Sequence, residues 1–358
     1  MQAEWKTFLR DRGAEFDAAD GVVGFGDPSR ERSAAVTGTV IADLSHIGVL
    51  AVRGADAETF LQGQFTNDVR HLDATHSQLN GYCSPKGRLL ATFRIVRVGD
   101  EFRLYLPRVM LESVRKRLQM FVMRSAVTLE EVSEHSMRIG VSGPNAAAAL
   151  AGPITPLPTA VDELTRCGEL TVLRIPGVQP RYEIFGPLLG SGLSMQKLWE
   201  ALAAHAAPVG SSTWELLDIL AGVPTIMAET ADAFVPQMVN YALIGGVSFK
   251  KGCYPGQEVV ARMQYLGKLK RQMYLARLQT DHAPRPGDDL FSPDDPQQSA
   301  GKIVNAQPHP EGGYAVLAVI QIGSREGGVV RLGTADGPGL TFAELPYAFA
   351  GGESSGNA

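Results

Sequence analysis

The chain has 358 residues, of which 44% are hydrophobic and 20% charged, with a formal net charge of −5 at neutral pH. These values are typical of a globular protein of two or three domains, and the net charge argues against nucleic-acid binding by the surface as a whole. No apolar run approaches the roughly 20 residues that span a bilayer, and residues 1–6 lack a signal-peptide pattern. We therefore expect a cytoplasmic protein with no membrane partner.

The three cysteines, Cys83, Cys167 and Cys253, are odd in number and far apart in the sequence. This pattern argues against a disulfide framework and favours a reducing compartment. Because there is no Cys-x-x-Cys pair and no metal-binding histidine spacing, we predict no metal site. One alternative stays open, in which Cys253 holds an iron–sulfur cluster between two subunits.

The first half of the chain predicts an N-terminal segment and then an α+β lobe. Residues 1–13 have the apolar stripe of a helix, and residues 17–36 have the composition of a linker. From there the pattern predicts strands and helices in the order strand 47–52, a helix begun by Asp56, strands 89–98 and 102–106, a helix over 109–123 and a strand over 137–141. This order is that of the split βαβ arrangement of ferredoxin-like layers.

A second α+β lobe is predicted beyond Pro144, so that the α+β region extends over residues 37–267. Its elements are a hairpin of residues 170–175 and 182–185 and helices over 194–206 and 212–221. After Gly267 the chain changes to short strands, predicted over 272–278, 302–306, 314–320, 329–331 and 340–343. A series of short strands is typical of a small antiparallel β-barrel, which we predict over residues 268–347. The tail 348–358 is expected to be disordered.

Reactive residue types are concentrated between Phe249 and Arg262. Two lysines precede Cys253, and Pro255 with the residues after it predicts the start of a helix. Neighbouring cations and a helix N-terminus both favour the thiolate, which is the reactive form of a cysteine. Cys253 is therefore a candidate reactive thiol. The alternative is that it is a small buried hydrophobe, which is the usual role of an isolated cysteine.

The run Lys251-Gly252-Cys253-Tyr254-x-Gly256-Gln257-Glu258 resembles the signature of the YgfZ family of folate-binding proteins, relatives of the glycine-cleavage T protein. Residues 234–240 and 245–249 are similar to the same family, and residues 61–69 more weakly. The resemblance covers most of residues 40–345. It implies a T-protein-like α+β region around a central cavity, followed by a C-terminal β-barrel, and the binding of tetrahydrofolate or a one-carbon derivative.

A tetrahydrofolate site needs a carboxylate or amide at the pterin edge, apolar walls, and cations near the glutamates. The residues that we predict for these roles are Glu258 and Gln257 at the edge, Tyr254, Met238 and Tyr241 along the walls, Lys251 and Arg262 near the glutamates, and Gly256 where backbone approaches the ligand. Asn67 and Asp68 either line the same pocket or cap a helix end. Cys253 is expected at the rim, with Lys251 as its partner in the chemistry.

The region around Cys253 is basic, in contrast to the chain as a whole. The cations between Phe249 and Arg277 are Lys250, Lys251, Arg262, Lys268, Lys270, Arg271 and Arg277, against Glu258 alone. Such an excess suits an anion, for example a folate glutamate tail or an RNA phosphate. The alternative is a solvated basic surface.

The acid–base group of the T protein is missing from this chain. That family carries two aspartates in a Gly-Gly-Ile-x-Asp-Asp run, and the matching positions here are Ala91 and Thr92. In that family a glutamate-rich segment also contacts the pterin, and this chain differs from it there. Only residues 181–184 can be compared with that segment. Because neither Ala91 nor Thr92 carries a carboxylate, the general acid/base group of the T-protein mechanism is missing. The sequence does not decide whether this protein is an enzyme.

The resemblance implies a tetrahydrofolate-binding protein that supports the assembly or repair of iron–sulfur clusters in client enzymes, including tRNA-modifying ones. Its expected partners are the folate, iron–sulfur client or assembly proteins, and tRNA in a weak contact. Two alternatives stay open. One is a folate-dependent aminomethyl- or methyltransferase, and the other is an RNA- or protein-binding module that uses the basic residues of 249–277.

Overall fold

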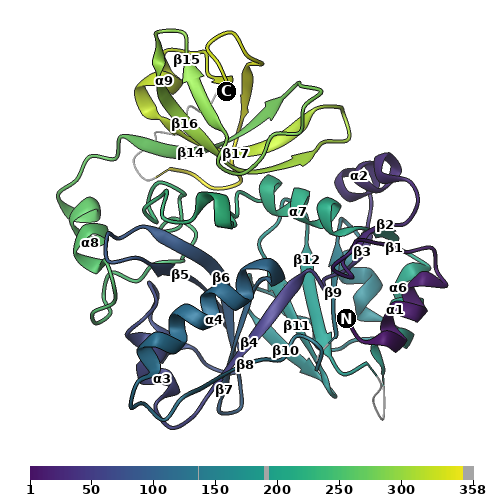
Figure 1. Ribbon diagram of the computed structural model, residues 1–358. Coiled ribbons are helices and arrows are strands. Elements are labelled where there is room, and N and C mark those ends of the chain that lie inside the picture. Colours follow the sequence, from purple (N-terminus) through teal and green to yellow (C-terminus); the bar gives the residue numbers. More distant parts are fainter. Residues whose placement is uncertain (136, 189–192, 350–358) are drawn as a thin grey trace.

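The computed structural model describes residues 1–135, 137–188 and 193–349. Two mixed lobes lie side by side, and a curled C-terminal sheet lies across them (Figure 1). The tail expected to be disordered falls outside the described residues from position 350 onward. Among the helices of the described ranges, none combines the length and the apolar composition that crossing a membrane requires.

The first lobe is a five-stranded antiparallel sheet in the order β5-β6-β7-β4-β8. Its strands are β4 (Ile47–Arg53), β5 (Ser77–Cys83), β6 (Leu89–Val98), β7 (Glu101–Pro107) and β8 (Thr128–Glu131). Its helical segments are α3 (Ala57–Gln62), η1 (Val69–His71) and α4 (Arg108–Val122). The apolar stripe of α4, which includes Leu111, Val114 and Leu118, packs on the sheet with Phe60 and Leu61 of α3, as the helical periodicity predicted.

The second lobe is a six-stranded sheet in the order β10-β11-β12-β9-β3-β13. Its strands are β3 (Val40–Asp43), β9 (Met137–Ser142), β10 (Leu164–Cys167), β11 (Leu170–Ile175), β12 (Arg181–Gly186) and β13 (Ala207–Val209). Its helices are α5 (Ala146–Ala151), α6 (Met195–Ala203) and α7 (Ser211–Leu220). The predicted placement of β9 in the first lobe is wrong, because β9 pairs with β12 and β3. The short strand β8 pairs with β4 instead.

The N-terminal segment is more regular than its composition suggested. Helix α1 (Ala3–Arg10) packs on the second lobe, where the rings of Trp5 and Trp199 meet edge to face at 5.7 Å. Strands β1 (Glu15–Phe16) and β2 (Val22–Gly24) form a small sheet. Helix α2 (Pro28–Thr37) occupies part of the predicted linker, because Asp27 accepts hydrogen bonds from the backbone of the first turn and Pro28 begins it.

The C-terminal unit is a six-stranded antiparallel sheet in the order β18-β15-β16-β17-β14-β19. Its elements are β14 (Arg271–Leu278), β15 (Asp289–Ser292), β16 (Asp295–Pro308), β17 (Tyr314–Gln321), α9 (Ile322–Glu326), β18 (Arg331–Leu332) and β19 (Leu340–Ala343). The sheet curls into a half-barrel whose edge strands are β18 and β19. One isolated bridge, from Arg331 to Gly339, lies beside these edge strands. Strand β15 was not predicted, and the expected strand 329–331 is displaced to β18.

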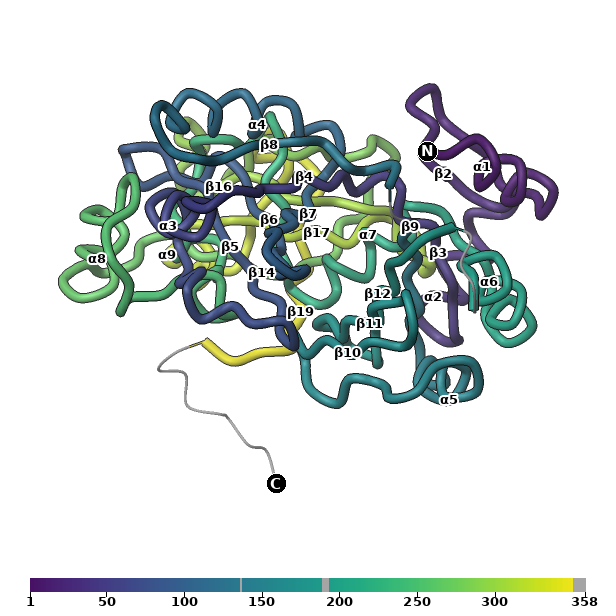
Figure 2. The backbone as a smooth tube through the Cα atoms, turned by 90° about the horizontal axis from the view of Figure 1, so that it is seen from below, coloured from purple at the N-terminus to yellow at the C-terminus, as the bar shows by residue number. Residues whose placement is uncertain are grey.

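Two helical segments connect the lobes to this sheet, η2 (Ala228–Thr230) and α8 (Gln257–Tyr265). Helix α8 lies at one end of the molecule, and α1 and α6 lie at the other (Figure 2). The helix start predicted after Pro255 is confirmed.

Candidate functional site

A cavity of about 410 Å³ lies where the three units meet. Its lining comes from the sheet of the first lobe, from β9, β12 and α7 of the second lobe, and from β16 of the C-terminal sheet. This volume is within the range of about 300–1,000 Å³ that is usual for small-molecule sites. The side chains that form its apolar walls are Leu79, Phe93, Tyr105, Ile219 and Tyr241.

The C-terminal sheet is held beside the cavity by hydrogen bonds between Asn305 of β16 and Thr225. The side chain of Asn305 donates to the carbonyl oxygen of Thr225 at 2.9 Å and accepts from its amide at 2.9 Å. Thr92, at the position of the missing aspartate, accepts from the amide of Ile226 at 3.0 Å and donates to the carbonyl of Pro224. The hydroxyl of Thr92 therefore holds residues 224–226 beside the cavity, and Ala91 is buried in the core of the first lobe.

Five charged side chains also line this cavity: Arg94, Arg138, Glu183, Glu215 and Asp218. Arg138 and Glu183 form a buried ion pair. Burial alone would raise the pKa of Glu183, but the arginines around it outweigh this and lower the pKa. Glu183 is therefore ionised at neutral pH. Asp218 pairs with Arg181 at 2.8 Å, whereas Arg94 pairs with Asp162.

Glu215 differs from the other carboxylates because no arginine pairs with it within the described residues. Its side chain lines the cavity and is exposed to solvent. Desolvation by the neighbouring protein atoms, with the nearby Asp218 carboxylate, raises the pKa of Glu215 to about 7, against the effect of a hydrogen bond from Gln307. Glu215 can therefore gain or lose a proton near neutral pH.

Several buried polar atoms around the cavity have no hydrogen-bond partner in the described chain. They include Nε and Nη1 of Arg138, the hydroxyl of Tyr105 and Nδ1 of His46. The guanidinium of Arg138 stacks on the ring of Tyr105 at 4.2 Å. A buried polar group without a partner costs about 1–3 kcal/mol, so this wall is suited to a ligand or water that supplies acceptors.

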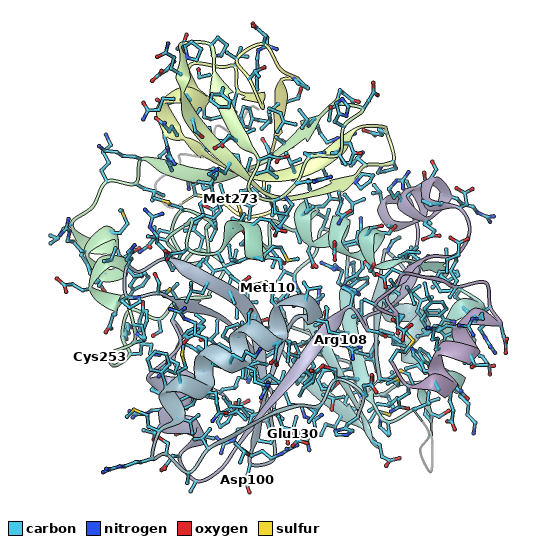
Figure 3. All side chains as sticks on the ribbon, viewed as in Figure 1. Asp100, Arg108, Met110, Glu130, Cys253 and Met273 are labelled. Atoms are coloured by element: carbon cyan, nitrogen blue, oxygen red, sulfur yellow. The ribbon has the colours of Figure 1, made fainter. Side chains whose placement is uncertain are left out.

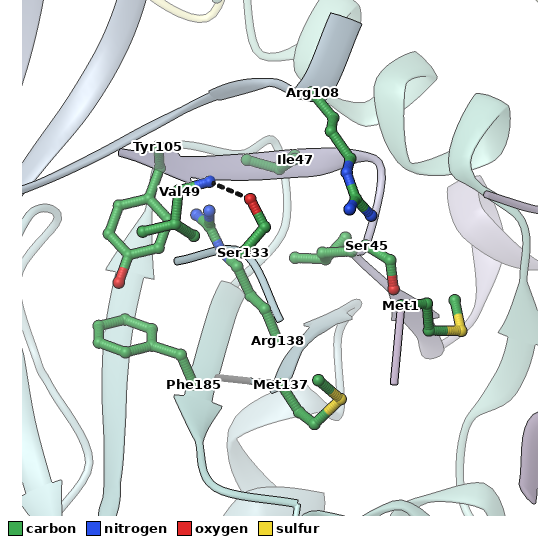
Figure 4. A pocket seen from close by; sticks show the side chains of 11 residues that line it. Met1, Ser45, Ile47, Val49, Tyr105, Arg108, Ser133, Met137, Arg138 and Phe185 are labelled. Atoms are coloured by element: carbon green, nitrogen blue, oxygen red, sulfur yellow. Dashed lines mark hydrogen bonds between the residues drawn. The ribbon is translucent and has the colours of Figure 1, made fainter. Parts of the chain in front are cut away.

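A second, smaller cavity of about 20 Å³ lies on another side of Arg138 and Tyr105 (Figure 4). Arg108 and Ser133 also line it, and the Ser133 hydroxyl accepts from the amide of Val49 at 3.0 Å. It has room for about one water molecule.

Tyr241 is the one predicted site residue among the described residues that line the large cavity, and its hydroxyl donates to the carbonyl of Asn80 at 3.0 Å. Cys253 does not line that cavity. It is exposed, in the loop before α8 at the edge of the molecule (Figure 3). The exposed position excludes the interpretation of Cys253 as a buried hydrophobe.

Lys251 is buried although it neighbours the exposed thiol. Its ammonium donates to the carbonyl oxygens of Gln62 at 2.7 Å, Asn67 at 2.9 Å and Phe65. Burial lowers the pKa of Lys251 to about 8, so it remains largely charged at neutral pH. The side chain therefore holds the cysteine loop on the segment after α3. Its predicted role in the chemistry of Cys253 stays a prediction.

Asn67 and Asp68 lie next to this contact and outside the cavity lining. The amide of Asn67 donates to the carbonyls of Leu79 at 3.0 Å and Gly245 at 2.6 Å. Asp68 accepts from the amide of Arg70 at 3.2 Å and caps η1. The second of the two interpretations, a helix-end cap, therefore describes Asp68.

The remaining predicted residues lie around α8 or in the core beneath it, outside the cavity lining. Tyr254 is buried and Met238 is partly buried, whereas Glu258 and Arg262 are exposed on α8, and Gln257 makes a long contact of 3.5 Å to the carbonyl of Lys251. Gly256 has φ +78°, and a Cβ there would lie 2.4 Å from Gly87. Glycine is required at this position by close backbone packing.

The charged cavity residues were not predicted from the sequence. Arg94, Arg138 and Glu183 are charged residues within largely apolar strands, although β6 and β12 each carry one further arginine. Such a charge is costly to bury unless it is paired. Charged residues in apolar strands were therefore the signal that the sequence offered. They indicate that oppositely charged partners exist, but they do not identify those partners.

Comparisons with known proteins identify the family. The family model described as GCVT N-terminal domain matches residues 24–247. The protein named tRNA-modifying protein YgfZ from Edwardsiella ictaluri is 33% identical, over 83% of this chain and 88% of that protein. The protein of the same name from Colwellia psychrerythraea is 30% identical, over 86% of this chain and 93% of that protein.

The chain belongs to the YgfZ family. A likeness to a solved structure, the glycine cleavage system aminomethyltransferase T from Bartonella henselae, has a TM-score of 0.77 at 18% identity and covers 95% of this chain and 96% of that one. This likeness concerns the fold alone. It confirms the predicted T-protein-like α+β architecture for this YgfZ-family member.

Proposed function

We propose that this YgfZ-family protein binds tetrahydrofolate or a one-carbon derivative in the large cavity, and that binding supports the modification of tRNA. The observation that carries the proposal is the convergence of apolar walls, an ionised carboxylate and unpaired arginine donors in one cavity of about 410 Å³. The tRNA part is supported by the names of the two relatives. The folate part is also supported by the shared T-protein-like fold.

A pterin presents a flat ring and an edge that carries both donors and an acceptor. Phe93, Tyr105 and Tyr241 provide walls for the ring. We assign the donor edge of the pterin to Glu183, which is ionised, and its carbonyl to the free N–H groups of Arg138. This assignment replaces the predicted pairing with Glu258 and Gln257, which do not line the cavity.

We further propose that Cys253 is the reactive thiol through which the protein supports iron–sulfur cluster assembly or repair in client enzymes. The thiol is exposed and its loop is held by Lys251. Because Cys253 does not line the cavity, its partner is a macromolecule at the surface, and the folate acts from a separate site.

One observation favours the alternative of one-carbon transfer. Glu215 lines the cavity, and desolvation together with the Asp218 carboxylate raises its pKa to about 7. A carboxyl group with this pKa suits general acid–base chemistry at neutral pH. Turnover of a methylene donor that is abolished by Glu215→Gln would establish this alternative.

The folate proposal is tested by calorimetric titration of tetrahydrofolate under anaerobic conditions. We expect Glu183→Gln to raise the Kd at least about tenfold, which is about 1.4 kcal/mol. The matched control is Glu258→Gln on the exposed surface of α8, which should bind as the wild type does. Thermal melts show whether each variant is folded. Loss of binding in Glu258→Gln alone would contradict the assignment.

A further inference from the structure

Segments that are far apart in the sequence meet beside Cys253. The turn of residues 84–88 lies against the start of α8, since a Cβ on Gly256 would lie 2.4 Å from Gly87, and one on Gly87 would lie 2.8 Å from Val259. The turn is held by its own backbone hydrogen bonds and by Arg88, which donates to the carbonyl of Ala233 at 2.6 Å. Lys86 and Arg88 are therefore presented next to α8.

The far end of α8 returns to the segment before the cysteine loop. The rings of Phe249 and Tyr265 meet edge to face at 6.1 Å. Lys250 follows Phe249 and Cys253 precedes Gly256, so both belong to the loop that joins these two contacts. We call the exposed residues of these segments the cysteine face; they are Lys86, Arg88, Lys250, Cys253, Arg262, Tyr265, Leu266, Lys268 and Lys270.

The cations of the cysteine face have no carboxylate partners within the described residues. In the first lobe, by contrast, Arg108 pairs with Glu134 at 3.2 Å and Arg115 pairs with Glu112 at 2.9 Å. Glu258 is the exposed carboxylate among the residues of α8. A chain with a net charge of −5 therefore concentrates unpaired positive charge around its exposed thiol.

The cysteine face also exposes apolar side chains among these cations. Tyr265 is 68% exposed and Leu266 is 85% exposed. An aromatic ring surrounded by unpaired lysines and arginines is the arrangement with which proteins bind nucleic acid, because cations neutralise phosphates and rings stack on unpaired bases.

We propose that the cysteine face binds the phosphate backbone of RNA and brings it next to Cys253. The inference rests on the tRNA role proposed above and names the surface that would serve it. An acidic protein is the competing occupant. RNA is favoured because the cations come from three separate segments around one exposed ring, which suits an extended polyanion.

The test measures binding of a fluorescently labelled tRNA transcript to the full-length protein across a range of salt concentrations. We expect the triple variant Lys86→Gln/Arg88→Gln/Lys250→Gln to bind at least about tenfold more weakly at 0.1 M salt. Its salt slope should fall by about 2 to 3, since each lost phosphate contact removes about 0.7–0.9. The matched control changes three exposed cations at the opposite end of the molecule, Arg10→Gln/Arg30→Gln/Lys197→Gln, and should bind as the wild type does.

A second readout follows the thiol itself. The transcript should slow alkylation of Cys253 by iodoacetamide, measured by peptide mass spectrometry, and leave Cys167 unaffected. No RNA binding by the wild type, an equal loss in the control triple variant, or binding of poly-glutamate in place of RNA would overturn the proposal. Tetrahydrofolate titration of the same variants separates the two proposals, because the cysteine-face variant should retain the folate affinity of the wild type.

Discussion

The ammonium group of Lys251 lies 2.9 Å from the carbonyl oxygen of Asn67. Asn67 in turn donates to the carbonyl of Leu79, whose side chain lines the large cavity. The exposed loop of Cys253 is therefore joined to the cavity wall by hydrogen bonds, although the thiol lies outside the cavity. In our proposals the small molecule and the macromolecule therefore occupy two separate sites, the cavity and the exposed loop.

Cys253→Ala should remove the function of the exposed thiol and leave folate binding in the cavity unchanged. We expect it to abolish tRNA modification in cells that depend on this protein, measured by mass spectrometry of nucleosides. Because the side chain is exposed, the free energy of unfolding should change by less than about 0.5 kcal/mol, and the affinity for tetrahydrofolate should not change. Cys167→Ala is the control and should keep full activity. An active Cys253→Ala protein would contradict the thiol proposal.

Lys251→Met should destabilise the fold, because it leaves three backbone carbonyls without their donor. We expect the free energy of unfolding in urea to fall by about 2–3 kcal/mol. Lys250→Met is the matched control, since Lys250 is exposed, and it should change stability by less than about 0.5 kcal/mol. Equal effects of the two substitutions would show that the three hydrogen bonds contribute little.

Gly256→Ala should disturb the contact between α8 and the turn of residues 84–88. The left-handed backbone and a Cβ 2.4 Å from Ser84 both oppose a side chain there. We expect a loss of about 3 kcal/mol in urea unfolding. Gly252→Ala is the control, because a Cβ at Gly252 meets nothing within 4 Å and its φ is ordinary. A Gly256→Ala protein as stable as this control would contradict the packing described here.

Glu215→Gln should change how stability depends on pH. The folded protein holds the proton of Glu215 up to about pH 7, whereas the ordinary pKa is 4.5. The contribution of Glu215 to stability is therefore fully present below pH 4.5 and is lost as the pH rises through 7. Glu215→Gln keeps the neutral form, so at pH 8 it should be more stable than the wild type by about 1–2 kcal/mol, after allowance for solvent in the cavity.

The comparison is made by urea unfolding at pH 5 and pH 8. Near pH 5 the two proteins should differ by much less than at pH 8. Glu258→Gln, on the exposed surface of α8, controls for the loss of a carboxylate as such and should follow the wild type at both pH values. A difference between wild type and Glu215→Gln that is the same at both pH values would rule out the raised pKa.

Local sequence patterns predicted most of the helices and strands, because the formation of each helix or strand depends on residues close to it in the chain. The apolar stripe of α4 and the alternation of β6 and β7 are of this kind. The membership of β9 was not predictable in this way, since its partners β3 and β12 lie far from it in the chain. Helix α2 was missed because its polar composition resembles that of a linker, although Asp27 and Pro28 are a usual helix start.

The sequence by itself determined the family and the α+β class, because these depend on a short run of residues and on local periodicity, whereas the reactive role of Cys253 stays a prediction. Only the tertiary structure decided that Cys253 and the cavity are separate, and that Arg138, Glu183 and Glu215 face a common space. The physical reason is that burial and charge pairing depend on contacts between distant segments. Lys251 illustrates this, because the three carbonyls that hold it come from residues 62–67.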